Sequence, residues 1–344
     1  MAKKVKLADI AQRTGVSTVT VSKALTGQKG VSEEMRERIK KLADEMGYVQ
    51  LSKEKRAGAG KSYNIGLLVE ESYIDKYDSF YLQMYQKVAT KAMDAGCFSL
   101  MEVIDRKADG EYALPRLMKE QKVDGVIILG KMPDSFLAFL KSHSAVPVVY
   151  MDFTDGAQDS DAVVPDSFYG AYQLTNYLFR MGHEKIAYVG TLLATSTITD
   201  RYLGYMKSMM EHGKKIREEW VIDDRSISSG YIDEVNLLNL PQDMPTAFVC
   251  NCDLTAGRMI NKLKESGYRV PEDVSVVGYD NFIYPGICDV EITTYEVDLG
   301  KMAQCAVDVL LEKIQRGDEH VPGIHTVEGH LVFKDSVREN RVRK

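Results

Sequence analysis

Two short apolar patterns separated by a glycine open the chain and constrain its fold most strongly. Leu7, Ile10 and Ala11 recur at helical spacing, and Gly15 stands where a helix would end. Ser17 then occupies an N-cap position, because its hydroxyl can accept a hydrogen bond from a backbone N–H group of the next turn. The spacing therefore predicts two helices joined by a short, fixed turn.

The second of these helices has one apolar face and one polar face. Its inner face carries Val16, Val21, Ala24 and Leu25. Its outer face carries Thr18, Val19, Ser22 and Lys23. A third helix is predicted over residues 32–46, with Ser32 as its cap. Outward polar side chains on the second helix of such a unit are what a recognition helix presents to the major groove of DNA.

The charge distribution supports the same interpretation. Residues 1–62 contain 14 Lys and Arg against 7 Asp and Glu, whereas residues 63–344 contain 30 against 43. A basic head on an acidic body concentrates phosphate contacts on the head and keeps the body from adhering to DNA. A plain three-helix bundle with a solvated basic face is the alternative. Because helical pattern, position and charge agree, we predict a DNA-binding head.

Length and composition exclude several classes of protein. A chain of 344 residues is too long for one ordinary core, and with 44% hydrophobic residues it has no apolar run long enough to span a membrane. Asp9 and Arg13 interrupt the N-terminal segment, so no signal peptide is expected and the location is expected to be cytoplasmic.

The cysteines suggest reduced thiols rather than a disulfide or metal framework. Five cysteines are present, an odd number, and they lie in or beside apolar segments. Cys250 and Cys252 lack further Cys or His partners at the spacing of a zinc site. We expect no metal and no cofactor.

From residue 64 onward, short apolar runs alternate with amphipathic helical patterns. The predicted strands are Ile65–Val69, Phe98–Val103, Gly125–Leu129, Val146–Met151, Ile186–Val189, Ala247–Cys250 and Val274–Gly278. The predicted helices include Phe80–Ala95, Asp134–Ser142, Tyr169–Met181, Arg201–Glu211, Leu254–Ser266 and Leu299–Arg316. This alternation predicts an α/β body with parallel sheets in two lobes. Ligands of such sheets bind outside the carboxyl ends of the strands, which two lobes can turn toward one cleft.

Enzyme signatures are weak in this sequence. The segment Ala57–Ser62 looks like the tail of a phosphate-binding loop, but it precedes a strand instead of following one, and a flexible linker explains it better. No G-x-G-x-x-G motif follows a strand, and no Ser/His/acid, metal or paired-carboxylate set can be argued. We therefore expect no enzymatic activity.

Several specific motifs resemble those of the LacI/GalR family of transcription regulators along the whole chain. They are residues 7–25 with Gly47-Tyr48, residues 181–190 (MGHEKIAYVG), residues 270–281 (VPEDVSVVGYDN), Ile292-Thr293-Thr294 and residues 331–336 (LVFKDS). The resemblance implies a homodimeric repressor that binds nearly palindromic operator DNA. It also implies a core similar to periplasmic sugar-binding proteins, whose effector is a sugar or a sugar derivative.

The resemblance also implies a division of the chain into parts. We expect an α/β protein with a helix-turn-helix head over residues 1–48 and a hinge or linker over residues 49–62. A two-lobed periplasmic-binding-protein-like core with parallel sheets should occupy residues 63–340. Its N-lobe is expected at about 63–161 and 293–324, and its C-lobe at about 162–290 and 325–340.

Carried over onto this sequence, the base-reading positions of the family fall on Thr18, Val19 and Lys23. Lys23 can donate to guanine, Thr18 can bond bases of either class, and Val19 can contact a thymine methyl group. Phosphate contacts are expected from Ser17, Thr20 and Ser22, and Tyr48 is expected to contact the DNA backbone or to pack. For Thr20 and Tyr48 a purely structural role is equally open.

The hinge departs from the family pattern Pro-Asn-x-x-Ala-Arg-x-Leu, in which the leucine wedges into the minor groove. The aligned residues here are 50–57, and Ala57 replaces the leucine. Lys53, Lys55 and Arg56 still offer positive charge to the DNA. We expect less operator bending than the leucine-bearing members produce.

The effector contacts of the family map onto Asp152, Arg201, Cys252 or Asp253, and Asp280. An arginine facing carboxylates and aromatic rings suits the hydroxyl groups and apolar faces of a sugar. The family often has asparagine where Cys252 stands, which leaves the ligand harder to identify. Aromatic candidates are Tyr73, Phe80, Tyr81, Trp220, Phe282 and Tyr284, and core packing is an open alternative for each ring.

Three other functions remain as alternatives. The regulator can be controlled mainly by a protein co-regulator instead of a small molecule. A solute-binding protein would need export, and an enzyme would need a catalytic set. Whether the effector releases or strengthens DNA binding depends on the conformer that it prefers, so the sequence leaves the sign of the response open.

Overall fold

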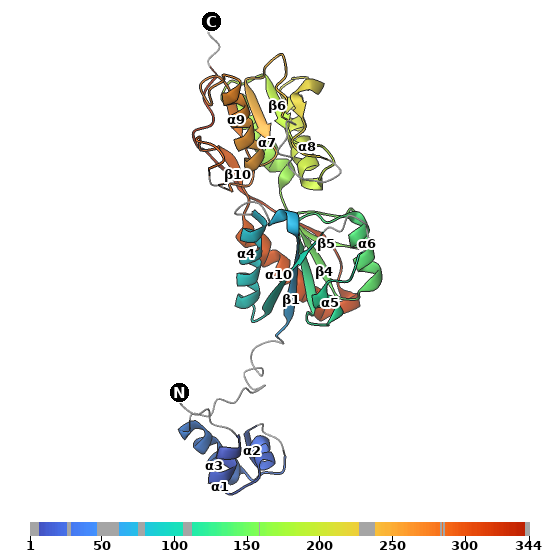
Figure 1. The fold of residues 1–344 in the computed structure, drawn as a ribbon, viewed down its shortest axis with the longest axis vertical. Helices are drawn as coiled ribbons and strands as arrows, with labels where there is room; N and C mark the ends of the chain where they lie inside the picture. The colour runs from blue at the N-terminus through green and yellow to red at the C-terminus, as the bar shows by residue number, and fades with distance from the viewer. Residues whose placement is uncertain are drawn as a thin grey trace. The chain divides into compact units, whose positions relative to one another are not determined.

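The chain, seen here in a computed structural model, divides into two compact units, Met1–Ser62 and Tyr63–Lys344. The structure describes residues 7–25, 29–46, 62–74, 80–105, 112–157, 159–226, 238–282, 284 and 286–340 (Figure 1). Among these residues, no helix is both long and apolar enough to cross a lipid bilayer. Each unit is described by itself below.

The first unit is a three-helix head formed by α1 (Leu7–Thr14), α2 (Thr18–Leu25) and α3 (Glu33–Glu45). Gly15 ends α1 in the left-handed region, with φ at 74°, where a side chain would be strained. The Ser17 Oγ accepts a hydrogen bond from the Thr20 N–H at 3.1 Å and so caps α2. The core of the head contains Ile10, Ala11, Val21, Ala24, Leu25, Ile39 and Ala43. The predicted helix-turn-helix is confirmed.

The second unit has two lobes, of which the N-lobe is built on a six-stranded parallel sheet in the order β11-β5-β4-β3-β1-β2. Its strands are β1 (Asn64–Glu70), β2 (Phe98–Ile104), β3 (Gly125–Leu129), β4 (Val148–Met151), β5 (Asp161–Pro165) and β11 (Ile324–Val327). Its helices are α4 (Phe80–Asp94), α5 (Arg116–Lys119), α6 (Asp134–His143) and α10 (Leu299–Arg316), with the short helices η2 (Glu71–Tyr73) and η4 (Gly317–Glu319). Buried side chains of α4 and α10 cover one face of the sheet, and those of α5 and α6 cover the other.

The C-lobe is built on a four-stranded parallel sheet in the order β7-β6-β8-β9. Its strands are β6 (Ile186–Val189), β7 (Val221–Ile222), β8 (Ala247–Cys250) and β9 (Ser275–Val277). Its helices are α7 (Ser167–Arg180), α8 (Ser196–Glu211), α9 (Asp253–Glu265) and the short η3 (Glu218–Trp220). An antiparallel pair, β10 (Thr294–Glu296) with β12 (His330–Val332), lies against α7.

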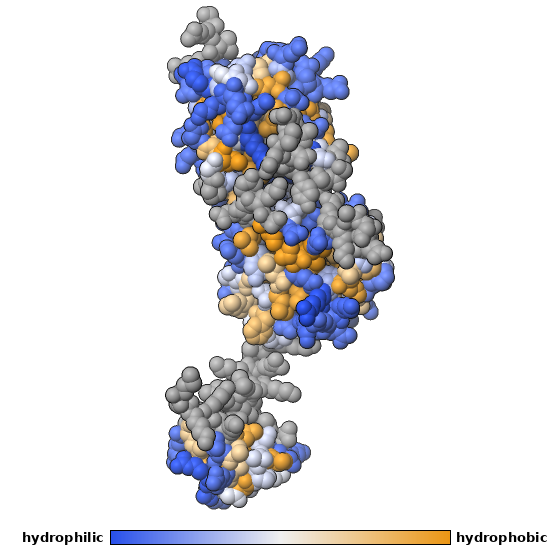
Figure 2. All heavy atoms as spheres, in the orientation of Figure 1, coloured by the Kyte–Doolittle hydropathy of each residue, from blue (hydrophilic) through white to orange (hydrophobic). Residues whose placement is uncertain are grey.

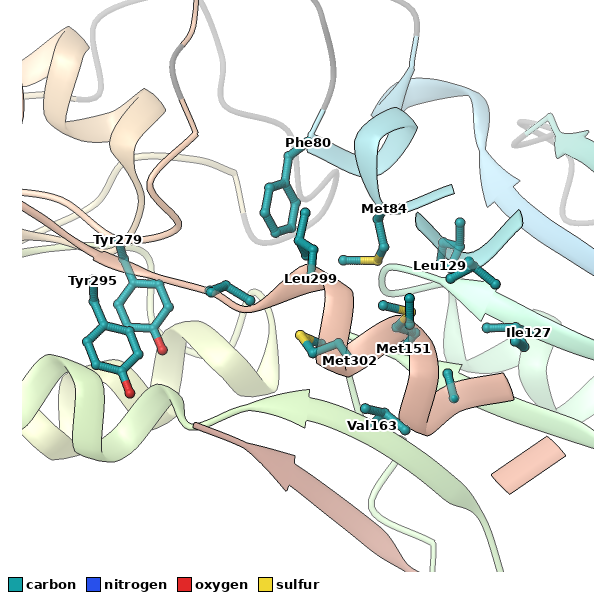
Figure 3. Close-up of a cluster of buried hydrophobic side chains, with 14 of the residues drawn as sticks. Phe80, Met84, Ile127, Leu129, Met151, Val163, Tyr279, Tyr295, Leu299 and Met302 are labelled. Atoms are coloured by element: carbon teal, nitrogen blue, oxygen red, sulfur yellow. The ribbon is translucent and has the colours of Figure 1, made fainter. Parts of the chain in front are cut away.

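One apolar cluster continues from the N-lobe into the C-lobe. Figure 3 shows Ile127, Leu129 and Met151 of the N-lobe sheet beside Met302 of α10. The paired rings of Tyr279 and Tyr295 lie at the other end of the view, with centroids 5.1 Å apart. Since the same buried cluster includes residues of α7, α8 and β6, the two lobes share packed side chains.

All seven predicted strands and six predicted helices occur, and their ends differ by at most two residues except at α8. This helix starts at Ser196, five residues before the predicted start, because the Thr195 Oγ1 caps it by accepting from the Ile198 N–H at 3.2 Å. Strands β5, β7, β10, β11 and β12 were not predicted. Because β5 and β11 pair within the N-lobe sheet, that lobe reaches Pro165 and Val327, beyond the expected limits of 161 and 324.

Candidate functional site

The outer face of α2 is available for contact in the head. Thr18, Val19 and Lys23 are exposed, and 61% of the Val19 surface is accessible although valine is apolar. Arg36 of α3 is buried and donates through Nη1 to the carbonyl oxygens of Lys23 and Ala24, at 3.2 and 3.0 Å. A cation at the carboxyl end of α2 satisfies carbonyl groups that the helix leaves open. The α2 backbone is thereby held while its outer side chains stay exposed.

The remaining predicted DNA contacts differ in their surroundings. Ser17 is exposed and Thr20 is half-buried, and their hydroxyl groups share a hydrogen bond of 2.9 Å. The hydroxyl group that donates in this pair would have to release its partner to donate to a phosphate, whereas the cap of α2 uses only an acceptor lone pair of Ser17. Ser22 is half-buried on the same helix. The predictions for Tyr48, Lys53, Lys55, Arg56 and Ala57 lie outside the described residues.

In the second unit, polar side chains gather where the strands of both lobes end. In the N-lobe, Asp152 follows β4 and Tyr73 ends the short helix after β1. In the C-lobe, Arg225 follows β7 and Asp280 follows β9, and Arg201 joins them from α8. We call Tyr73, Tyr81, Asp152, Arg201, Arg225 and Asp280 the interlobe cluster. Parallel sheets place ligand contacts at this edge.

Arg201 lies at the centre of the interlobe cluster and is 5% exposed. Its Nη2 is 3.4 Å from the Asp280 Oδ1, and its Nη1 donates to the Asn251 carbonyl oxygen at 2.5 Å. The guanidinium carbon lies 3.7 Å from the centroid of the Tyr279 ring. Among the described residues, the buried Arg201 Nε has no hydrogen-bond acceptor. Arg201 is therefore held internally and still has one donor to offer.

Burial changes the protonation of the two carboxyl groups that face Arg201. Burial raises the pKa of Asp280 to about 7, against the opposing effect of Arg201. It also raises the pKa of Asp152, whose Oδ2 accepts from the Tyr81 hydroxyl at 2.8 Å. Asp152 also contributes to the raised pKa of Asp280, although the two residues belong to different lobes. The structure brings together Asp152, Arg201 and Asp280, onto which the effector contacts of the family were mapped.

Arg225 is a second arginine of the interlobe cluster that the sequence did not single out, and it is half-buried. Its Nε and Nη2 bond the Asp224 carboxylate at 2.8–3.2 Å, and Nη2 also reaches the Asn251 Oδ1 at 3.0 Å. Burial alone would raise the pKa of Asp224, but Arg225 and further hydrogen bonds outweigh it and lower that pKa. Arg225 follows β7, and a recognisable strand there would have pointed to it, but β7 has only two residues. A strand that short leaves no detectable pattern.

The aromatic candidates of the N-lobe are close to these charges. The Tyr73 and Tyr81 rings lie 4.3 Å apart, and the Tyr73 hydroxyl donates to the Lys131 carbonyl oxygen at 3.0 Å. Phe80 is buried, and its ring centroid is 6.0 Å from that of Phe282 in the C-lobe. Phe282 in turn packs against Tyr284 at 4.6 Å. Rings from both lobes thus border the interlobe cluster.

Cys252 and Asp253 have different surroundings. The Cys252 thiol donates to the Thr255 Oγ1 at 3.3 Å and lies 3.8 Å from the Arg225 Nη2, so it borders the interlobe cluster. Burial raises the pKa of the Cys252 thiol. Asp253 is 4% exposed, and its Oδ2 accepts from the Phe282 N–H at 3.0 Å. Asp253 therefore holds the loop after Asp280.

Trp220 is not at the interlobe site, so this prediction is wrong. The ring is 3% exposed within the C-lobe core, and its indole N–H donates to the Asp243 carbonyl oxygen at 2.9 Å. Trp220 precedes β7 and thus lies at the amino end of the strand, opposite the edge where the polar groups gather. A large ring at that position fills the core.

Two further polar residues have structural roles. The Asp166 carboxylate caps α7 by accepting from the Tyr169 N–H at 3.0 Å. His183 is 4% exposed and bonds the Thr246 Oγ1 at 3.0 Å and the Arg338 carbonyl oxygen at 3.1 Å. Burial lowers the pKa of His183. Neither residue belongs to the interlobe cluster.

Two family models match parts of this chain. The model described as "Bacterial regulatory proteins, lacI family" matches residues 6–50, and the model of a "Periplasmic binding protein-like domain" matches residues 175–337. The HTH-type transcriptional repressor PurR of Pectobacterium carotovorum is 29% identical over 322 residues, which is 92% of this chain and 93% of the relative. The PurR repressor of Escherichia coli is 28% identical over 97% of both chains.

Solved structures share the fold over nearly the whole chain. The lac repressor dimer bound to operator and an anti-inducer has a TM-score of 0.69 at 22% identity, with 98% of this chain and all of that chain covered. The complex of the regulator CelR with cellobiose has a TM-score of 0.67 at 24% identity, with 97% and 100% covered.

These likenesses confirm the resemblance inferred from the motifs. The head matches the DNA-binding model, the core matches the ligand-binding one, and full-length relatives are repressors instead of enzymes. The chain therefore belongs to the LacI family of bacterial regulatory proteins, as a DNA-binding transcriptional repressor with a periplasmic-binding-protein-like ligand-binding core.

Proposed function

We propose that this repressor reads its operator through the outer face of α2 and changes its affinity when a polyhydroxyl ligand binds at the interlobe cluster. Thr18, Val19 and Lys23 contact base edges, and Ser17, Thr20 and Ser22 contact phosphates. Tyr48, Lys53, Lys55 and Arg56 add backbone contacts from the following segment. The protein acts where operator DNA is, in the cytoplasm.

The observation that carries the effector proposal is the buried pairing of charges around Arg201. Arg201 faces Asp280, and Arg225 is matched by Asp224, so neither guanidinium supplies a surplus positive charge. Asp152 adds a further carboxyl group. An anionic ligand is disfavoured here, whereas sugar hydroxyl groups can donate to carboxylates and accept from the Arg201 Nε. Neighbouring rings can cover the apolar faces of a sugar.

A flat heterocycle such as a purine base is the second candidate. Rings from both lobes border the cluster, with Phe80 and Phe282 at 6.0 Å, and stacking on such rings favours a planar ligand. The repressors that are 26–29% identical to this chain carry the name PurR, which supports including purines in the same test.

Calorimetric titration distinguishes these two ligand classes. The panel contains glucose, galactose, cellobiose, maltose, adenine and hypoxanthine, and mass spectrometry of the purified protein checks for a retained molecule. We expect a sugar to bind and to change operator affinity. Binding of a purine alone would replace the sugar proposal. Operator release by a partner protein, with no binding by any small molecule, would favour control by a co-regulator.

Lys23→Ala is expected to weaken operator binding by about 1–3 kcal/mol and to relax the preference at one base pair of each half-site. Lys53→Ala should weaken binding to all sequences alike, since it removes a phosphate contact. Lys40→Ala is the control, because Lys40 pairs with Glu37 on α3 and not with the outer face of α2. Fluorescence anisotropy on operator and random duplexes measures both affinities. Equal losses on both duplexes for Lys23→Ala would contradict base reading.

We also propose that the protein is a homodimer and that β2 belongs to the interface. β2 is an edge strand of the N-lobe sheet, and it exposes Phe98 (69%), Leu100, Met101 and Val103 (each 38–39%). Figure 2 shows apolar residues at the surface of this lobe, in the region of α4 and β1. An edge strand with exposed apolar side chains is a surface that a partner commonly covers. A dimer suits a nearly palindromic operator.

The double substitution Phe98→Asp and Met101→Asp is expected to shift the protein from dimer to monomer at micromolar concentration. Two buried carboxylates in an apolar interface cost far more than the lost contacts. Met210→Asp is the control, because Met210 is equally apolar and 70% exposed but lies on α8 of the other lobe. Sedimentation velocity measures the assembly. A dimer that survives the double substitution would place the interface elsewhere, and a stable tetramer of the unmodified protein would contradict the proposed state.

A further inference from the structure

The turn that carries Asp280 has an unusual backbone. Asp280 and the next residue, Asn281, both have positive φ angles, 103° and 52°, although neither is glycine. Such conformations cost free energy and persist only where surrounding contacts hold them. Two consecutive residues have such a conformation, and one of them, Asp280, is the predicted effector contact. This indicates that neighbouring residues impose the position of the Asp280 carboxylate.

The backbone of this turn is held mainly by the segment that crosses back to the N-lobe. The Asp280 N–H donates to the Tyr295 carbonyl oxygen at 2.9 Å, and the Asp280 carbonyl oxygen accepts from the Val297 N–H at 3.5 Å. The Asn281 N–H lies 3.4 Å from the Thr294 Oγ1. Residues 294–297 lead directly to Asp298, the cap of α10. The ligand contact is therefore tied to a helix of the opposite lobe.

Three side chains add to the hydrogen bonds between this turn and residues 294–297. The Lys334 Nζ donates to the Asn281 Oδ1 at 2.8 Å, and the Asn281 Nδ2 donates to the Glu296 Oε2 at 2.6 Å. Glu296 is the last residue of β10, and Lys334 follows β12, the strand that pairs with β10. All three side chains are only half-buried, so their hydrogen bonds are partly shielded from water.

We propose that Asn281, Glu296 and Lys334 form a positioning bridge that holds the Asp280 carboxylate toward Arg201 and couples it to the start of α10. The bridge rests on the proposed function in one respect, namely that the effector contacts Asp280. Its residues touch no ligand themselves. They act by keeping the strained turn in the conformation that the ligand needs, and by passing a shift of Asp280 to residues 294–298.

The first test needs no ligand. Lys334→Met keeps the length of the side chain and removes its donor, so hydrogen exchange of the amides of Asp280 and Phe282 is expected to speed up at least tenfold. Lys334→Arg should restore slow exchange, because arginine also donates to Asn281. Lys264→Met is the matched control, since it removes an exposed ion pair with Asp289 in the same lobe. Unchanged exchange in Lys334→Met would overturn the bridge.

Asn281→Gly separates the bridge from backbone strain and guards against a Lys334 variant that fails to fold. Glycine adopts a φ of 52° without cost, so this substitution relieves strain while it removes both side-chain hydrogen bonds. We expect faster exchange at Asp280, as in Lys334→Met. Exchange as slow as in the unmodified protein would show that the backbone contacts alone hold the turn, and would refute the bridge.

The second test measures coupling. For the panel compound that binds the unmodified protein, Lys334→Met should raise the concentration for half-maximal operator response at least tenfold, while operator affinity without the compound changes less than twofold. Operator affinity that falls by the same factor without the compound would mean a general structural defect and would reject the coupling role. If no compound binds the unmodified protein, the effector proposal fails, and the exchange experiment still decides the bridge.

Discussion

Arg201→Ala is expected to lower the stability of the core and to abolish the effector response together. The buried Arg201 guanidinium faces Asp280 and also stabilises the charge of Asp152. Removing one partner of a buried ion pair leaves the other uncompensated, which typically costs about 3–5 kcal/mol. The same change removes the Arg201 Nε, the buried donor offered to the ligand. Urea unfolding and calorimetric titration measure the two effects separately.

The control for this substitution is Arg116→Ala, which removes an arginine whose side chain is 81% exposed and pairs with Glu120 on the surface. It should change stability by well under 1 kcal/mol. If Arg201→Ala lowers stability but leaves ligand affinity intact, Arg201 has a structural role only and does not contact the effector. If stability does not change, the internal ion pair contributes nothing, and the loss of response alone would define Arg201 as a ligand contact.

Asp280→Asn is expected to stabilise the protein relative to the unmodified chain as the pH rises. Burial raises the pKa of Asp280 to about 7, well above the ordinary value near 4. The folded state therefore keeps a proton that the unfolded state releases, so unmodified protein loses stability as the pH rises from about 4 to 7. The loss reaches about 1.4 kcal/mol per pH unit at most, and asparagine does not titrate. Between pH 5 and 7.5, the free energy of unfolding of Asp280→Asn should therefore rise by about 2–3 kcal/mol relative to that of the unmodified protein.

Urea unfolding of both proteins at several pH values measures this difference. At pH 5 the folded carboxyl group is still protonated and resembles the asparagine amide in shape and charge, so the stability difference should be smaller there than at pH 7.5. Asp289→Asn is the control, because the side chain of Asp289 is 66% exposed in a surface ion pair. A stability difference that stays flat from pH 5 to 7.5 would show that Asp280 is already ionised at pH 5, contrary to the raised pKa.

The resemblance to the family mapped proposed ligand contacts onto residues that follow a well-formed strand. Asp152 follows β4 and Asp280 follows β9, and both strands are short apolar runs that periodicity identifies. Arg225 was missed because β7 has only two residues, and Trp220 was misplaced because composition does not tell which end of a strand faces the ligand. The exposed and buried faces of α2 follow the helical period, which is a local property.

The sequence by itself determined the helix-turn-helix head, the alternation of strands and helices and the motifs of the family, because each depends on residues that are near one another in the chain. Only the tertiary structure decided that Arg201 is buried against Asp280, that Arg225 pairs with Asp224, and that Lys334 reaches Asn281. These contacts join residues far apart in sequence, and the pKa of Asp280 depends on its burial and on Arg201, Asp152 and Arg225. No local pattern encodes such burial, since it arises only when the lobes pack together.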